Sequence, residues 1–159
     1  MIIQIKGIKD EDTVNYCKTS MFIAWPHCTF KCDQENGCQY CQNMPLTRYP
    51  DISIGTEVLV SRYLNNPLSH AIVMGGLEPF DSWEQLVGLI AHFRSRTNDD
   101  IVIYTGYEEH EKLRQTDALK AFPNIIIKWG RFRPNQRPHF DKVLGVKLAS
   151  DNQYAIRIS

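Results

Sequence analysis

Four short apolar runs, separated by segments with a helical period, constrain the fold of this chain more than any other feature. The runs are rich in Ile and Val and span Ser20 to Trp25, His70 to Met74, Asp100 to Tyr104 and Asn124 to Trp129. Continuous apolar runs of this length are typical of strands buried on both faces of a parallel sheet. Strands that alternate with helices imply a parallel sheet with right-handed crossovers.

The segments between the runs predict helices. One has apolar residues at helical spacing, namely Trp83, Leu86, Val87, Ile90 and Phe93. Ser82 and Gln85 predict a capping box at its start. We expect further helices from Gly55 to about Asn65 and from Glu108 to Ala121, the second ending before Pro123.

These units are too few for a closed eight-stranded barrel, which takes about 250 residues. We therefore expect an α/β fold, an open or partial (β/α) barrel with a mainly parallel sheet. Residues 1–9 alternate apolar and polar and predict one more strand. The chain has no repeat or linker, so we expect a single domain over residues 1–159. Ligands of such sheets bind beyond the carboxyl ends of the strands.

Charge and hydropathy argue against two classes of partner. The 18 basic residues balance the 18 acidic ones, so no net charge attracts nucleic acid or an anionic membrane. The apolar runs are far shorter than the roughly 20 residues of a membrane-spanning helix. The N-terminus lacks a secretory signal pattern. We expect a cytoplasmic protein.

Four of the five cysteines are crowded into residues 26–43, directly after the first apolar run. They are Cys28, Cys32, Cys38 and Cys41, whereas Cys17 stands apart and is expected to be a small buried residue. Clustered thiolates suit zinc or an iron-sulfur cluster. A structural zinc site usually has a longer segment between its ligand pairs, so the spacing favours a cluster, with zinc as the alternative.

The cysteine loop resembles the radical SAM signature, Cys-x3-Cys-x2-Cys, through its Cys-x3-Cys opening and through Tyr40-Cys41-Gln42-Asn43. The resemblance implies a [4Fe-4S] cluster with one open iron, S-adenosylmethionine (SAM) as second cofactor, a radical SAM type of barrel and Tyr40 at the cofactor site. Because the loop contains inserted residues, four cysteines are available for the three ligand positions of the signature. We favour Cys28, Cys32 and Cys41, which keep the start of the loop unchanged; the alternative replaces Cys32 by Cys38.

Two further motifs follow the second and third runs. Gly75-Gly76-Leu77-Glu78-Pro79 is a turn pattern, and with Leu77 inserted it resembles the radical SAM motif that contacts the methionine amino group. The resemblance implies that Gly75, Gly76 and Glu78 bind SAM, because glycine lets backbone approach a ligand and a carboxylate accepts hydrogen bonds from an ammonium.

The third run ends in Thr105-Gly106-Tyr107, which resembles the activating protein of anaerobic ribonucleotide reductase, as does Ser150 to Gln153. This resemblance implies Thr105 and Gly106 at the cofactor site. It also implies that the chain is an enzyme with no catalytic side chain beyond the cluster. Its partners would be a glycyl radical enzyme, the large subunit of the reductase, and an electron donor such as flavodoxin or ferredoxin.

Two other functions remain open on this sequence. One is a radical SAM enzyme that acts on a small molecule, like the 7-carboxy-7-deazaguanine synthases. The other is a non-enzymatic zinc or iron-sulfur interaction module. The basic, aromatic stretch from Lys128 to Lys142 is interpreted as a solvated face with a few core aromatics.

Overall fold

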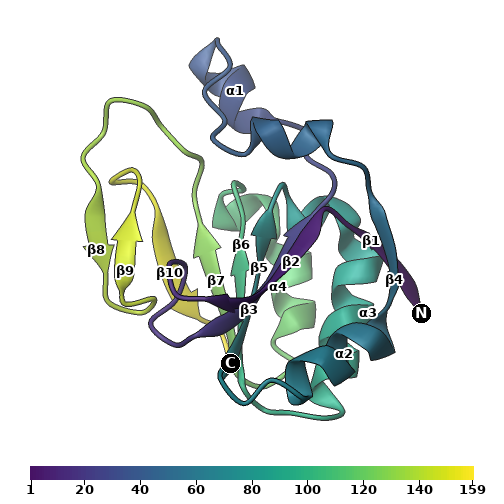
Figure 1. The fold of residues 1–159 in the computed structure, drawn as a ribbon. Helices are drawn as coiled ribbons and strands as arrows, with labels where there is room; N and C mark the ends of the chain where they lie inside the picture. Colours follow the sequence, from purple (N-terminus) through teal and green to yellow (C-terminus); the bar gives the residue numbers. More distant parts are fainter.

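The computed structural model describes residues 1–159, and a six-stranded sheet forms its centre (Figure 1). In sheet order its strands are β10 (Tyr154–Arg157), β7 (Ile125–Trp129), β6 (Asp100–Tyr104), β5 (Ala71–Gly76), β3 (Ser20–Trp25) and β2 (Gly7–Asp12). The four inner strands are parallel, whereas β2 and β10 pair antiparallel at the two edges. The four predicted buried strands are confirmed, with small shifts at their ends.

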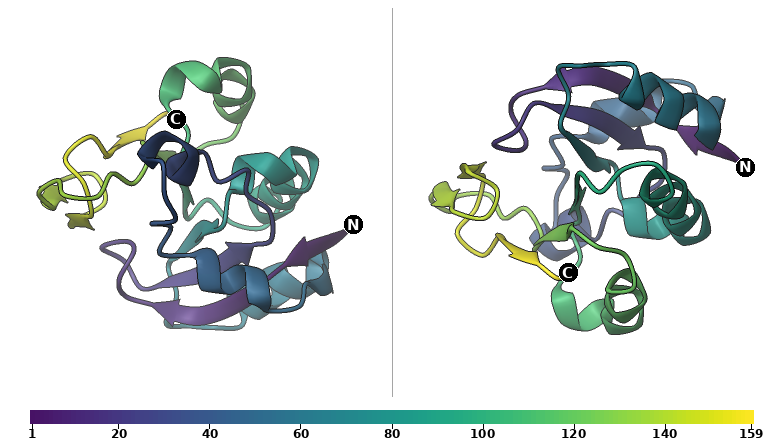
Figure 2. Two further views of the ribbon diagram at one scale, coloured as in Figure 1. Left: turned by 90° about the horizontal axis from the view of Figure 1, so that it is seen from above. Right: turned by 90° about the horizontal axis from the view of Figure 1, so that it is seen from below.

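Three helices cover one face of the sheet, as Figure 2 shows from above and below. They are α2 (Thr56–Leu64), α3 (Trp83–Arg94) and α4 (Leu113–Leu119). Their buried apolar residues pack against alternate residues of the strands, among them Met74 and Ile103, in the larger core cluster. The strand residues between them point to the opposite face of the sheet and form the smaller core cluster. The apolar runs are therefore buried on both faces of the sheet.

Two details of these helices differ from the sequence-based expectation. Ser82 makes no capping bond, and the Gln85 side chain instead accepts a hydrogen bond of 2.9 Å from the backbone N–H of Gln4. The helix expected from Glu108 breaks into a short 3-10 turn, η3 (Glu109–Glu111), and α4. A reciprocal capping box between Glu108 and Glu111 closes this turn, and Lys112 leaves helical geometry at φ −129°.

The opposite face of the sheet is covered by a hairpin of β8 (His139–Asp141) and β9 (Val146–Leu148). The buried Asp141 carboxylate fixes this hairpin to β10, because it accepts a hydrogen bond of 2.9 Å from the Ala155 N–H. Cys17 lies nearby, and its amide donates to the Leu144 carbonyl. Its side chain is exposed, so the expectation of a buried residue was wrong: backbone pairing, not thiol burial, fixes this position.

The N-terminal segment forms two strands instead of the one expected. β1 (Ile2–Ile5) pairs with β4 (Ile52–Gly55) in a separate antiparallel ribbon, and β2 joins the central sheet. Ile3 and Ile5 of this ribbon extend the larger core cluster. None of the helices is both long and apolar enough to cross a membrane.

The remaining short elements lie near the carboxyl ends of the parallel strands. They are α1 (Lys31–Asn36), η1 (Met44–Arg48) and η2 (Pro79–Ser82). α1 and η1 belong to the long connection that follows β3, and in Figure 1 this connection lies above the strand ends. The predicted motifs therefore all lie at the carboxyl ends of the parallel strands.

Candidate metal centre

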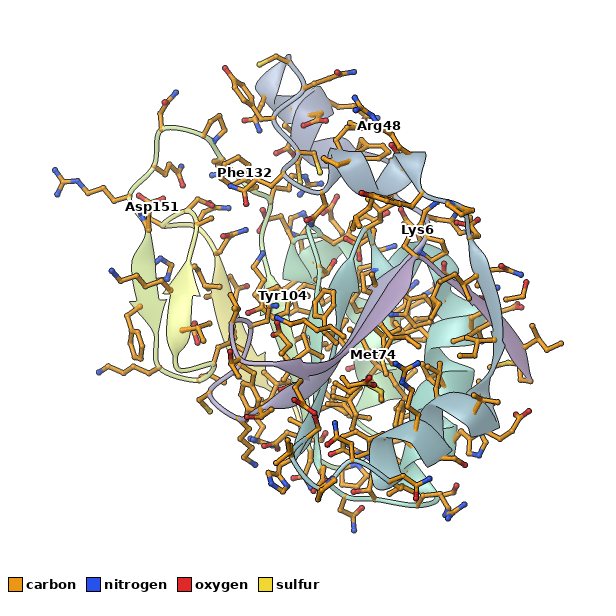
Figure 3. All side chains as sticks on the ribbon, viewed as in Figure 1. Lys6, Arg48, Met74, Tyr104, Phe132 and Asp151 are labelled. Atoms are coloured by element: carbon orange, nitrogen blue, oxygen red, sulfur yellow. The ribbon has the colours of Figure 1, made fainter.

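A cavity of about 410 Å³ lies at the carboxyl ends of the parallel strands, next to the cysteine loop. It is lined by residues from all three predicted motifs and from the end of β7, including Cys28, Cys32, Cys41, Gly75, Gly76, Glu78, Thr105, Gly106, Tyr107 and Lys128. Phe132 borders it beside the connection that carries α1, and Tyr104 borders it further down the sheet (Figure 3). Of the predicted site residues, Tyr40 alone is absent from the lining, and its side chain is 46% exposed.

Cys28 is held between the ends of β3 and β5. Beyond the strands, the Glu78 N–H donates a hydrogen bond of 2.7 Å to the His27 carbonyl. The Thr29 N–H donates to the Asp81 carboxylate at 2.9 Å, and the Tyr107 hydroxyl donates to the other oxygen of Asp81. These bonds fix the chain on both sides of Cys28.

Cys32 is carried by α1, which a buried arginine holds against the end of the sheet. Arg131 lies 3.0 Å from the Glu35 carboxylate on α1 and 2.8 Å from the Glu111 carboxylate on η3. Its side chain is only 6% exposed. The interpretation of residues 128–142 as a solvated face is therefore wrong for Lys128 and Arg131, because long-range ion pairs and strand burial hold them inside.

Cys41 and Cys38 follow α1 in the chain but have different environments. The amides of Tyr40 and Cys41 both donate to one oxygen of the Asp33 carboxylate, at 2.9 Å each. Cys38 is exposed, its thiol donates to the Asn36 carbonyl at 3.3 Å, and it is absent from the cavity lining. The structure brings Cys28, Cys32 and Cys41 to one cavity, while the ligand set itself stays a prediction.

The three lining thiols are held in their neutral form by their surroundings. Burial raises the pKa of Cys28 to about 12 and raises the pKa of Cys32 and of Cys41 above the usual thiol range. Metal binding must therefore displace protons from these thiols. No three His, Cys, Asp or Glu side chains are grouped closely enough to hold a single ion. The donors at the cavity are soft thiols, which fit an iron-sulfur cluster.

Comparison with known proteins assigns the family. A family model described as a 4Fe-4S single cluster domain matches residues 17–153. The chain belongs to this family. The matched region contains the cysteine loop and every lining residue named above. Val14 and Asn15 also border the cavity and lie outside the matched region. The chain is thus an iron-sulfur protein, and the match favours a cluster over zinc. No curated protein and no solved structure matches it.

The two glycines of the 4Fe-4S domain's second motif have different neighbours. Gly76 has φ +84°, and a Cβ added there would lie 2.9 Å from Ala24 Cα, so the packing of β5 on β3 requires glycine. Its carbonyl accepts a hydrogen bond of 2.6 Å from the Asn43 side chain, which links the motif to the cysteine loop. A Cβ at Gly75 would instead meet the ring of Phe22 at 3.1 Å, beside the cavity.

Glu78 connects the second motif to the third. One oxygen of its buried carboxylate accepts hydrogen bonds from the Thr105 hydroxyl at 2.8 Å and from the Phe80 N–H at 3.1 Å. The other oxygen accepts from the Gly106 N–H at 2.8 Å. Burial raises the pKa of Glu78 to about 7, although these three bonds oppose the shift. The side chain therefore contacts both the cavity and the end of β6.

Lys128 is a site residue that the sequence-based interpretation missed. Its side chain is buried at the cavity, and its ammonium donates to the Gly130 carbonyl at 3.0 Å. Burial lowers the pKa of Lys128 to about 8. A lysine inside an apolar run that is buried on both faces was the available signal, since lysine is rarely buried without a partner or a function. Asp33 lies on the short helix α1 and Arg131 in the loop after β7, and their local sequence carries no such signal.

The C-terminal segment that resembles the reductase activator supports the wall of the cavity. The Gln153 side chain donates to the Gly130 carbonyl at 3.2 Å, and the Asn152 side chain donates to the Arg131 carbonyl at 2.9 Å. These bonds tie the segment before β10 to the residues that follow β7. Ser150 and Gln153 are both buried.

Proposed function

We propose that the protein is a radical SAM enzyme that cleaves SAM at a [4Fe-4S] cluster and generates a glycyl radical on an anaerobic ribonucleotide reductase. Cys28, Cys32 and Cys41 hold the cluster in a radical SAM type of open barrel. When bound and reduced, the cluster supplies one electron to SAM, which yields methionine and a 5′-deoxyadenosyl radical. One observation carries the proposal: these three cysteines share a cavity with Gly75, Gly76, Glu78, Thr105 and Gly106.

The charges at the cavity suit the methionine part of SAM, which carries an ammonium and a carboxylate. The Glu78 carboxylate and the Gly76 carbonyl are hydrogen-bond acceptors at the end of β5. Lys128, on β7, supplies a buried cation to the same cavity. Charged hydrogen bonds are stronger in such a poorly solvated site, so this acceptor and cation pair supports binding of a zwitterion.

In this proposal the electron donor is a low-potential protein such as flavodoxin or ferredoxin, and the partner is the large subunit of the reductase. Both come from the resemblance of Thr105-Gly106-Tyr107 and Ser150 to Gln153 to the activating protein. The protein works in the cytoplasm, because five free cysteines suit a reducing compartment.

The first test is anaerobic reconstitution with iron and sulfide, followed by an assay for 5′-deoxyadenosine. We expect about four irons per chain and SAM cleavage with a low-potential reductant. Cys28→Ala, Cys32→Ala and Cys41→Ala should lose the cluster, whereas Cys38→Ala and Cys17→Ala should keep it. Stoichiometric zinc in a colourless, air-stable protein would contradict the proposal.

The second test addresses the partner. Mixed with SAM, reductant and the anaerobic reductase subunit, the protein should produce a glycyl radical doublet in that subunit by electron paramagnetic resonance. Replacing the target glycine by alanine should abolish the signal. SAM cleavage that a small nucleobase stimulates, with no radical on the reductase, would instead identify an enzyme acting on a small molecule.

A further inference from the structure

The segment between Cys32 and Cys41 has to bring its two ends together, and one carboxylate closes it. α1 ends at Asn36, the following Gly37 has φ +70°, and the chain then turns back toward the start of the helix. The Tyr40 and Cys41 amides donate hydrogen bonds of 2.9 Å to the same Oδ1 of Asp33. Asp33 is only 9% exposed. Cys41 is thereby tied to the residue that follows Cys32.

The same closure leaves Cys38 outside. Cys38 follows Gly37, and its exposed thiol donates to the Asn36 carbonyl at the end of α1. The three other thiols of the loop border the cavity. A loop with four cysteines therefore presents three of them to one site, and the Asp33 bonds reach Cys41 and not Cys38.

We propose that Asp33 is a positioning residue that selects Cys41 over Cys38 as the third cysteine ligand of the cluster. The inference rests on the proposed function in one respect, namely that the cavity holds a cluster. The proposed role of Asp33 involves no other side chain of the loop, because Asp33 binds the backbone amides of Tyr40 and Cys41. Without the acceptor, two part-buried amides lose their partner and the loop opens.

The geometry supplies a matched pair of variants. Both loop bonds end on Oδ1, and the buried Oδ2 has no hydrogen-bond partner. Asp33→Asn retains an acceptor for both amides, whereas Asp33→Leu has a similar shape and no acceptor. Asp33→Asn is also the control for charge, because it removes the acid and keeps the acceptor.

The test has two measurements. In the apoprotein, amide hydrogen exchange of Tyr40 and Cys41 should become about tenfold faster or more in Asp33→Leu, because a hydrogen bond is lost at each amide. Exchange in β5 should stay slow, which separates local opening from unfolding. Asp33→Asn should exchange like the wild type.

In the reconstituted protein, alkylation by iodoacetamide followed by mass spectrometry reports which thiols bind iron. The wild type and Asp33→Asn should show Cys41 protected and Cys38 labelled, and Asp33→Leu should lose this preference. Slow exchange at both amides together with protected Cys41 in Asp33→Leu would overturn the proposal. If no cluster forms even in the wild type, the proposed function fails, and slow exchange in Asp33→Leu would still refute loop closure by Asp33.

Discussion

The Glu78 carboxylate and the Thr105 hydroxyl are joined by a hydrogen bond of 2.8 Å between the ends of β5 and β6. The two residues are 27 positions apart in the chain and belong to different motifs. The neighbouring Gly106 amide binds the second carboxylate oxygen. A buried acid thus fixes the relative position of two strand ends that border the cavity.

Glu78→Gln should destabilise the apoprotein by about 1–3 kcal/mol, the cost of a buried polar group without its partner. In either orientation the glutamine NH2 would face a backbone N–H, of Gly106 or of Phe80, and two donors cannot bond. Denaturant titration of the free energy of unfolding measures the effect. Thr105→Val, which removes one donor and leaves the carboxylate, should cost less. A Gln variant as stable as the wild type would contradict the bridging role.

Gly106→Ala should lower the amount of iron bound on reconstitution. A Cβ at this position would lie 3.1 Å from the Cys32 sulfur, so the thiol must move. Iron per chain after anaerobic reconstitution gives the readout. Gly7→Ala is the matched control, because a Cβ at Gly7 meets no atom within 4 Å. Full iron loading of Gly106→Ala would show that Cys32 has room to adjust.

Arg131→Met should destabilise the apoprotein at neutral pH, and the loss should shrink as the solution becomes acidic. The hydrogen bond from Arg131 lowers the pKa of Glu111 from 4.5 to about 2. A depressed carboxyl pKa stabilises the fold above pH 4.5, and this contribution is lost as the pH falls toward 2. Urea titrations over this range compare the two proteins. A constant difference at all pH values would mean that packing, not the ion pair, is responsible.

Lys128→Met should change how stability depends on alkaline pH. Burial lowers the pKa of Lys128 from 10.5 to about 8 in the folded protein. Between these values the unfolded chain binds one more proton than the folded one, so wild-type stability rises with pH relative to the variant. Unfolding of both apoproteins across this interval measures the slope. Parallel curves would show that the ammonium keeps its ordinary pKa.

Local pattern was sufficient for the four buried strands, for helix α3 and for the crowding of thiols after Trp25. Apolar runs must leave water whatever their neighbours are, and the carboxyl ends of parallel strands meet at one edge. The order of the motifs therefore predicted that Cys28, Gly76 and Gly106 would approach one another, and all three border the cavity.

Tertiary structure alone decided which side chains complete that edge. The sequence favoured Cys28, Cys32 and Cys41 as ligands and left Cys38 as the alternative to Cys32. In the structure Cys32 and Cys41 border the cavity, whereas Cys38 is exposed and donates to the Asn36 carbonyl. The burial of Lys128 depends on the neighbouring strand β6, and that of Arg131 on ion pairs with Glu35 and Glu111; these partners lie far away in the chain. Such contacts exist only after the sheet has formed, because folding then determines which charges are buried together and which face water.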